Sequence, residues 1–389
     1  MLKVGIDAIS FYTSHHYLEL KTLAEERGID PNKYLTGLGQ HKMAIAAPGE
    51  DIVTLAANAA EAIVSKANIA QIDMVLFATE SGIDQSKAAG LYIHKLLDLS
   101  PHCRVVELKQ ACYSGTAGLQ LGLGYLQQNP TRKVLLLTAD IARYGLHTPG
   151  ESSQGCGAVA MLLSVNPKLL TIEPESGFYT QDNMDFWRPN YCDEAFVDGK
   201  ASSKLYLQML EKTWQQYASH SGKRLSEHEA ICFHTPVPSL SERAQKHLLK
   251  IENSANKHFL TRIEQALYYN RVVGNCYTAS LYLSLCSLLE TATDDLGTKR
   301  VGFYSYGSGA TAEFFSGVIQ SDYQASLLKN IHSQLLAERQ QLSYAEYKNF
   351  YNFKLPQDGS SLEVPHFNTG KFRLVRIENH KRMYERIGE

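Results

Sequence analysis

The stretch Glu107–Gly122, ELKQACYSGTAGLQLG, decides how the chain is interpreted, because an apolar segment gives way to a run of small residues around one cysteine. The preceding CRVVEL (103–108) predicts a strand, and SGTAGLQLGLGYLQQ (114–128) has helical leucine spacing. Cys112 therefore falls near a helix N-terminus, where free backbone N–H groups and the helix dipole favour a thiolate. Small neighbours let a substrate approach closely. Cys112 is a candidate nucleophile, and the alternative is an inert thiol packed under the helix.

Strand and helix patterns alternate around this stretch through most of the chain. Short leucine-rich or β-branched runs predict strands at 3–12, 72–80, 103–108, 133–142, 157–165, 230–236 and 299–307. Helical spacing predicts helices at 51–67, 84–99 (with Asp84 as N-cap), 114–128, 202–220, 241–252 and 278–292. From residue 323 onward the pattern predicts a helical, charged tail. This alternation is typical of an α/β architecture.

Composition limits the classes of function. The 389 residues are 44% hydrophobic, which is enough for more than one core-sized unit. With 38 Lys and Arg against 40 Asp and Glu, no basic face predicts a nucleic-acid partner. No apolar run reaches the ~20 residues of a membrane span, and the N-terminus lacks the apolar region of a secretory signal. Seven irregularly spaced cysteines without a C-x-x-C pair indicate reduced thiols in a cytoplasm rather than disulfides or zinc.

Two other strand ends carry groups that could exchange protons with Cys112. Glu80 ends the apolar run VLFATE, where a carboxylate is costly unless it caps a helix or takes part in chemistry. His234 ends AICFH, just before a turn at Pro236. Strand ends of α/β sheets are where ligands collect, so the three groups form a candidate site. The plainer alternatives are a capping or exposed role for Glu80 and a structural role for His234.

Several motifs in order then carry a family resemblance: ATESGID, KQACYSGTAG, DIARYG, FWRP, VDGK, FHTP, YNRVVGNCYTASLYLSL and FYSYGSG. Together they resemble the 3-hydroxy-3-methylglutaryl-CoA synthase family in its compact bacterial form, from Val4 to about Gly317. The resemblance implies a thiolase-like, five-layered αβαβα fold built from two similar halves, usually as a homodimer. The halves would be 1–165, with Glu80 and Cys112, and 166–389, with His234, Asn275 and Ser308.

The resemblance also implies roles for individual residues. Cys112 matches the acylated nucleophile, Glu80 the general acid/base, and His234 the residue that anchors the second substrate. Polar groups in the substrate site are matched by Asn275 and Ser308 near the acetoacetyl group, Asp140 and Tyr144 as supports, Ser202 near the CoA arm, and Ser153 and Arg243. Simple alternatives remain for two of these, because Asn275 could cap a helix and Ser308 could belong to a tight turn.

The implied reaction condenses acetyl-CoA with acetoacetyl-CoA and water to give 3-hydroxy-3-methylglutaryl-CoA and CoA, in isoprenoid biosynthesis through mevalonate. Cys112 would take the acetyl group, and Glu80 would remove a proton from its methyl carbon. His234 would donate a hydrogen bond to the keto oxygen that is attacked. No cofactor or metal is expected, since the coenzyme A thioesters are substrates and no metal-ligand spacing occurs.

The chain departs from the family after His234. The family usually has two lysines there that contact CoA phosphates, whereas this chain has Ser239 and Arg243, with Lys246 on the same predicted helix. Arginine can replace lysine as a phosphate partner, but serine brings no charge. The motifs ESGID and KQACYSGTAG also resemble those of relatives that install β-branches on polyketides bound to acyl carrier proteins. The short tail and MDFWRP favour the mevalonate enzyme.

Two alternative functions remain to be considered. A thiolase-fold protein that has lost catalysis could serve as a binding subunit, although the presence of Cys112, Glu80 and His234 together opposes this. Ketoacyl synthases and thiolases typically use two histidines, or a histidine and a second cysteine, where this chain offers Glu80 and His234.

Overall fold

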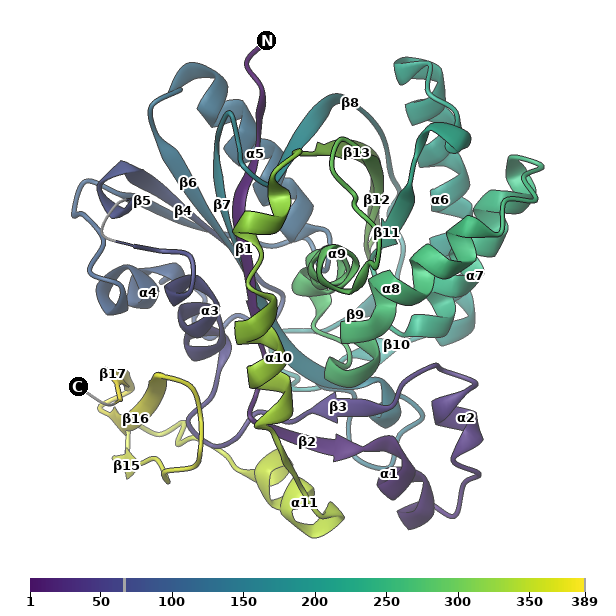
Figure 1. The fold of residues 1–389 in the computed structure, drawn as a ribbon. Helices are drawn as coiled ribbons and strands as arrows, with labels where there is room; N and C mark the ends of the chain where they lie inside the picture. Colours follow the sequence, from purple (N-terminus) through teal and green to yellow (C-terminus); the bar gives the residue numbers. More distant parts are fainter. Residues whose placement is uncertain (66–67, 388–389) are drawn as a thin grey trace.

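A nine-stranded mixed sheet runs through the computed structural model, which describes residues 1–65 and 68–387 (Figure 1). Its strand order is β11-β12-β13-β8-β1-β7-β6-β4-β5. The strands are β1 (Val4–Tyr12), β4 (Ile72–Ala78), β5 (Arg104–Leu108), β6 (Lys133–Ala142), β7 (Gly155–Val165), β8 (Leu170–Thr180), β11 (Ala230–Phe233), β12 (Arg300–Gly307) and β13 (Thr311–Ile319). The α/β prediction is confirmed, and each predicted strand forms.

The strand order repeats in the two halves of the chain. In the first half β1-β7-β6 are antiparallel neighbours and β4 joins β6 in parallel. In the second half β8-β13-β12 are antiparallel and β11 joins β12 in parallel. The halves meet where Gly5 and Ile6 of β1 pair with Thr171 and Leu170 of β8. A Cβ on Gly5 would lie 2.0 Å from the Leu170 carbonyl oxygen, so this close approach requires glycine.

Helices cover and separate these strands: α3 (Ile52–Glu61), α4 (Gly90–Leu96), α5 (Ser114–Gln128), α6 (Gly199–Ser221), α7 (Pro238–Ile251), α8 (His258–Val273) and α9 (Ser280–Thr291). Helix α9 lies at the centre of the molecule and is buried from Ser280 to Glu290 (Figure 1). Helix α5 lies directly on the first-half strands, because a Cβ on Gly118 or Gly122 would come within 2.6–2.7 Å of Leu136 or Leu163. The small residues near Cys112 therefore permit close helix–sheet packing.

Short elements complete the body: β2 (His16–Glu19), α1 (Leu20–Glu26), α2 (Asn32–Leu35), β3 (Lys42–Ala44), β9 (Phe186–Trp187), β10 (Phe196–Val197) and β14 (Gln340–Gln341). The main apolar core extends over both halves, and a second cluster lies among α6, α7, α8 and the strands β11–β13. In the described part of the chain, no helix has the length and apolar character needed to cross a membrane.

Three expectations about helices need correction. The helix expected at 51–67 ends at Glu61, and residues 66 and 67 lie outside the described residues. The helix expected from Asp84 begins only at Gly90, because the Asp84 carboxylate accepts hydrogen bonds from the Ser86 and Lys87 N–H groups and closes a local turn.

The C-terminal tail is only partly helical, which is the third correction. After α10 (Lys329–Ala337) and α11 (Tyr344–Asn352) it forms a small antiparallel sheet of β15 (Leu362–Glu363), β16 (Phe372–Glu378) and β17 (Lys381–Arg386). Phe372 and Leu374 are buried at alternate positions of β16, which is the period of a half-buried strand. Its many charged residues masked this alternation in the sequence.

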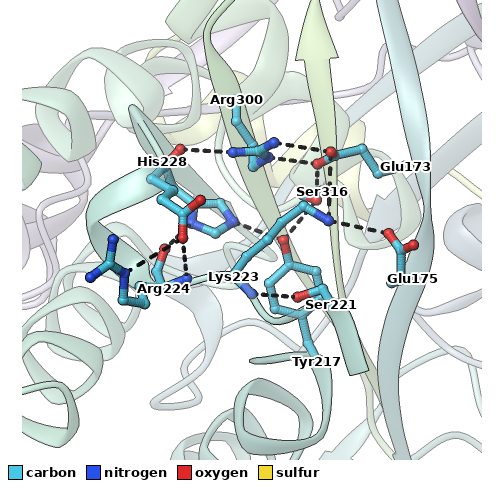
Figure 2. A network of polar contacts seen from close by, with 10 residues as sticks. Glu173, Glu175, Tyr217, Ser221, Lys223, Arg224, His228, Arg300 and Ser316 are labelled. Carbon is cyan, nitrogen blue, oxygen red and sulfur yellow. Dashed lines mark hydrogen bonds and ion pairs between the residues drawn. The ribbon is translucent and has the colours of Figure 1, made fainter. Parts of the chain in front are cut away.

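A polar network in the second half joins the end of α6 to β8, β12 and β13 (Figure 2). The Glu173 carboxylate accepts hydrogen bonds from Arg300 at 2.7 Å and from the Ser316 hydroxyl at 2.5 Å. The Tyr217 hydroxyl lies 2.8 Å from Ser316 and 2.9 Å from Nε2 of His228. Burial lowers the pKa of His228 to about 4, so this imidazole is neutral at pH 7. The network thus holds the end of α6 against the strands of the second half, and the histidine in it is neutral.

Candidate active site

The thiol of Cys112 donates a hydrogen bond to Oε1 of Glu80 at 2.7 Å. Glu80 follows β4, and Cys112 lies in the turn between β5 and α5. Ala111 reverses the chain there with φ +43°, and the Ser114 hydroxyl closes the turn by accepting from Gln110 N–H at 2.6 Å and donating to Ala111 O at 2.8 Å. Two strand ends chosen from sequence are therefore in direct contact.

The Cys112 turn packs against the second half of the chain. A Cβ on Gly307 would lie 2.6 Å from Tyr113 N, so glycine allows this contact. The Gln110 side chain donates to the Ser308 carbonyl at 3.3 Å, and the Tyr113 hydroxyl donates to Glu313 at 2.7 Å. Ser308 thus lies beside the Cys112 turn, and its backbone supports that turn.

Asp140 joins Glu80 to the segment after Asn275. Oδ1 accepts from the Glu80 N–H and the Thr79 hydroxyl, each at 2.9 Å. Oδ2 accepts from the Thr278 N–H at 3.0 Å and its hydroxyl at 2.5 Å. Asp140 is completely buried, so these donors offset the cost of burying its carboxyl group.

His234 follows β11 and is held by groups of the second half. Its N–H donates to Tyr304 O at 2.8 Å, and its carbonyl accepts from the Tyr206 hydroxyl at 2.7 Å. Its ring nitrogen Nδ1 lies 2.7 Å from Oγ of Ser280. Burial lowers the pKa of His234 to about 3, so the ring is neutral at physiological pH.

A cluster of three aromatic rings, the aromatic wall, lies near Cys112 and Glu80. Tyr144, Phe186 and Tyr277 pack edge to face, with ring centroids 5.8–6.1 Å apart. Asn275 holds two of them, since its Nδ2 donates to the Tyr144 hydroxyl at 3.2 Å and its Oδ1 accepts from Tyr277 N–H at 2.9 Å. Asn275 therefore orients the wall rather than capping a long helix.

Tyr277 was not among the site residues predicted from the sequence. Its φ is +41°, which is unusual for a bulky residue, and its buried hydroxyl has no hydrogen-bond partner among the residues that the structure describes. Its place beside Asn275 in the quoted motif was the available signal.

Protonation in the site differs from the expectation based on the helix terminus. Burial and the neighbouring Glu80 raise the pKa of Cys112 well above its usual value, so the resting group is a thiol. Burial and the charge of Asp140 raise the pKa of Glu80 to about 8. Arg188, which contacts the Glu80 carbonyl, opposes this shift with its positive charge. Enclosure of the pair outweighs the helix dipole.

The segment with β9 and β10 covers this region through Asp185. The Asp185 carboxylate accepts from the Ser202 hydroxyl at 2.9 Å, the Tyr306 hydroxyl at 2.7 Å and Gly309 N–H at 3.1 Å. Ser202 therefore supports the covering segment. Asp185 was missed because it follows no strand or metal pattern, although an acid inside the aromatic motif MDFWRP was a signal.

Ser153 is not brought into contact with the three catalytic candidates. Its hydroxyl donates to Gly150 O at 2.8 Å within a local turn. The adjacent Gln154 reaches the site instead, since its Oε1 accepts from Tyr144 N–H at 2.9 Å.

Arg243 lines a separate cavity of about 490 Å³ between α6 and α7. Lys200 and Lys204 of α6 line the same cavity, whereas Lys246 does not. The two α6 lysines were missed because they are far from Arg243 in sequence. Within residues 1–65 and 68–387, no cluster of three or more His, Cys, Asp or Glu side chains could hold a metal ion.

Comparisons with known proteins agree with this geometry. Residues 2–168 match the family model described as hydroxymethylglutaryl-coenzyme A synthase N terminal, and residues 238–386 match its C-terminal counterpart. The chain belongs to the hydroxymethylglutaryl-CoA synthase family. The thiolase-like fold of two similar halves that the sequence motifs implied is thereby confirmed.

Three relatives of this synthase family are informative. Hydroxymethylglutaryl-CoA synthase of Enterococcus faecalis is 42% identical, and the alignment covers 98% of this chain and 100% of the relative. A crystal structure of HMG-CoA synthase complexed with CoA superimposes with a TM-score of 0.96 at 38% identity, covering 99% of this chain and 100% of that one. The polyketide-biosynthesis 3-hydroxy-3-methylglutaryl-ACP synthase of Bacillus subtilis is 34% identical, over 90% of this chain and 88% of the relative.

Proposed function

We propose that the protein condenses acetyl-CoA with acetoacetyl-CoA and water to give 3-hydroxy-3-methylglutaryl-CoA and CoA, as a step of the mevalonate pathway. The 2.7 Å contact between the Cys112 thiol and Glu80 carries this proposal, because it pairs a nucleophile with a base. The 42% identical Enterococcus faecalis synthase and the CoA-bound structural relative support it.

The first step transfers the acetyl group to Cys112. Glu80 accepts the thiol proton as the sulfur attacks the thioester carbonyl of acetyl-CoA, and the proton then passes to the departing CoA thiolate. A carboxyl pKa of about 8 suits both directions of this transfer, since the group is neither fully ionised nor fully protonated near neutral pH.

The second step forms the carbon–carbon bond. The Glu80 carboxylate removes a proton from the acetyl methyl group, and the resulting carbanion attacks the keto carbon of acetoacetyl-CoA. Neutral His234 donates a hydrogen bond to the oxygen on which negative charge develops, and Glu80 returns its proton to that oxygen. Water then cleaves the thioester to Cys112 and restores the thiol. These steps use no metal and no cofactor other than the CoA carried by the substrates.

The cavity beside Arg243 is proposed to hold the phosphates of CoA. Lys200, Lys204 and Arg243 line it, and within the described residues none of the three has an ion-pair partner within 4.0 Å. Three cations against the single carboxylate of Glu211 give the cavity lining a net positive charge, which attracts a polyanionic carrier. They also compensate for Ser239, which stands where the family usually has a lysine.

We further propose a cytoplasmic homodimer. Strand β5 lies at the edge of the large sheet, and Val106 on it is 47% exposed. An exposed apolar edge strand is a template for pairing with a second copy of the chain. Light scattering of the wild type and of Val106→Lys tests the dimer, which the lysine should dissociate.

The cytoplasmic location rests on the cysteines. All seven are free thiols, which suits a reducing compartment.

The activity is tested by incubating the purified protein with acetyl-CoA and acetoacetyl-CoA and detecting the product by mass spectrometry. A parallel reaction supplies acetoacetyl-acyl carrier protein in place of acetoacetyl-CoA. Product from the CoA substrate supports the proposal. Product only from the carrier protein would assign the chain to polyketide β-branching, and no acetylated protein in either reaction would indicate a binding subunit.

A further inference from the structure

Ser280, the first residue of α9, lies between His234 and the turn at Tyr277. Its Oγ is 2.7 Å from His234 Nδ1 and 3.0 Å from Tyr277 O, and it accepts a hydrogen bond from Thr235 N–H at 3.2 Å. Both Ser280 and His234 are buried. Within the described residues, His234 Nδ1 has Ser280 as its only hydrogen-bond partner and Nε2 has none.

The serine hydroxyl has one hydrogen to give, and two acceptors lie within reach. The Tyr277 carbonyl already accepts the backbone N–H of Ser280, so it stays satisfied when the hydroxyl turns away. His234 Nδ1 has no second donor. Donation to Nδ1 satisfies both side chains and leaves the hydrogen on Nε2, the ring nitrogen without a partner among the described residues, available for a substrate oxygen.

The direction of this bond decides what His234 can do. A neutral imidazole carries one hydrogen, and the partner of one ring nitrogen sets which nitrogen holds it. When Ser280 donates to Nδ1, the hydrogen is on Nε2 and His234 is a donor. When Ser280 donates to Tyr277, the hydrogen is on Nδ1, and Nε2 presents a lone pair that would repel a substrate oxygen.

We propose that Ser280 is a positioning residue that selects the Nε2–H tautomer of His234 and so makes His234 a hydrogen-bond donor to the substrate oxygen. The inference rests on the proposed function, because that oxygen is the keto oxygen of the second substrate. It gives a role to Ser280, a residue inside the motif YNRVVGNCYTASLYLSL to which the sequence assigned none.

The surrounding structure holds Ser280 in this position. Tyr277 N–H is bound by Asn275, and Thr278 is bound twice by Asp140, which also binds the Glu80 backbone. The serine that orients His234 is thus on the same short segment that Asp140 ties to Glu80. Asp140 and this segment therefore fix the position of Glu80 relative to that of His234.

Ser280→Ala tests the proposal, with Ser284→Ala as the matched control. Ser284 lies one turn further along α9, is equally buried, and contacts Asn270 and Phe233 rather than the His234 ring. Nitrogen-15 NMR of histidine-labelled protein reports the tautomer. Wild type and Ser284→Ala should show His234 with hydrogen on Nε2, and Ser280→Ala should show a mixture or the Nδ1–H form.

Kinetics provides the second readout. Ser280→Ala should lose on the order of 10²-fold in condensation rate, the usual scale for one oxyanion donor, while acetylation of Cys112 by acetyl-CoA stays within about twofold of wild type. Ser280→Thr keeps the hydroxyl and should restore both the tautomer and condensation.

Two results would overturn the inference: an Nδ1–H tautomer in the wild type, or condensation by Ser280→Ala at the wild-type rate. The NMR measurement uses the resting protein and needs no turnover. If the wild type forms no acetyl-enzyme, the proposed function fails, while the tautomer spectrum still decides whether Ser280 orients His234.

Discussion

Cys112 and Glu80 are 32 positions apart in the chain, yet the thiol donates a hydrogen bond to the carboxyl oxygen at 2.7 Å. Neither group has its ordinary acidity, because burial raises both pKa values, Glu80 raises that of Cys112 further, and the charge of Asp140 raises that of Glu80. The resting pair is therefore predominantly protonated at neutral pH. The nucleophile is generated when the carboxylate takes its proton, rather than stored as a thiolate.

Replacing Cys112 with alanine should abolish covalent acetylation and leave the fold intact, because the substitution removes only the sulfur atom. Intact-protein mass spectrometry after incubation with acetyl-CoA measures this directly. Cys103→Ala is the matched control, since Cys103 is also a half-buried free thiol. An acetyl group on Cys112→Ala would remove this thiol from the mechanism.

Glu80→Gln should slow acetylation and eliminate condensation, because a carboxamide cannot accept the methyl proton. In the wild type, the acetylation rate should rise with pH as Glu80 ionises, with a midpoint near its pKa of about 8. Stopped-flow release of CoA between pH 6 and pH 9 measures the profile. The variant should be flat over this range, and an unchanged profile would assign the titration to another group.

The same substitution should change stability in a pH-dependent way. In the unfolded chain Glu80 ionises above its ordinary pKa of 4.5, whereas the folded protein retains the proton to about pH 8. Stability is therefore lost as pH rises through this window. Glu80→Gln removes the penalty and should raise the free energy of unfolding by about 4 kcal/mol at pH 8, with little change at pH 4.

Urea denaturation at the two pH values checks this expectation. The exposed Glu385→Gln serves as the control, and its effect should be small at both. Equal destabilisation by Glu80→Gln at pH 4 and pH 8 would show that Glu80 ionises normally in the folded protein.

Arg243→Ala should raise the KM for CoA thioesters on the order of tenfold with little change in kcat, because remote phosphate contacts bind ground state and transition state alike. Lys246→Ala, on the same helix but outside the cavity, should have a smaller effect. Added salt should weaken the difference. Pantetheine thioesters without the nucleotide phosphates should show no dependence on Arg243, and a dependence there would place Arg243 elsewhere in the substrate site.

Local sequence patterns were sufficient to predict which residues at strand ends belong to the candidate site. Glu80, Cys112 and His234 each follow a run of apolar residues, so their approximate positions follow from the sheet. Ser280 and Asp185 were not accessible in this way, because their roles depend on partners dozens of residues away.

The pKa of Cys112 was predicted in the wrong direction, because the local sequence favours a lowered value and the structure raises it. The start of α5 favours a thiolate, but the enclosure of Cys112 and the carboxyl beside it depend on how the halves pack. The C-terminal sheet was missed for a related reason. Its apolar positions become visible as a strand pattern only once Phe372 and Leu374 have an inner face to occupy.

The short pairing of β1 with β8 at Gly5 and Ile6 is supplemented by the shared apolar core and by polar contacts at the active site. Asp140 binds Thr278, and Gln110 binds Ser308, across that boundary. These hydrogen bonds, which align the reacting groups, therefore also help to hold the two halves together. A substitution at Asp140 or Gln110 is therefore expected to change the joining of the halves and the alignment of the reacting groups together.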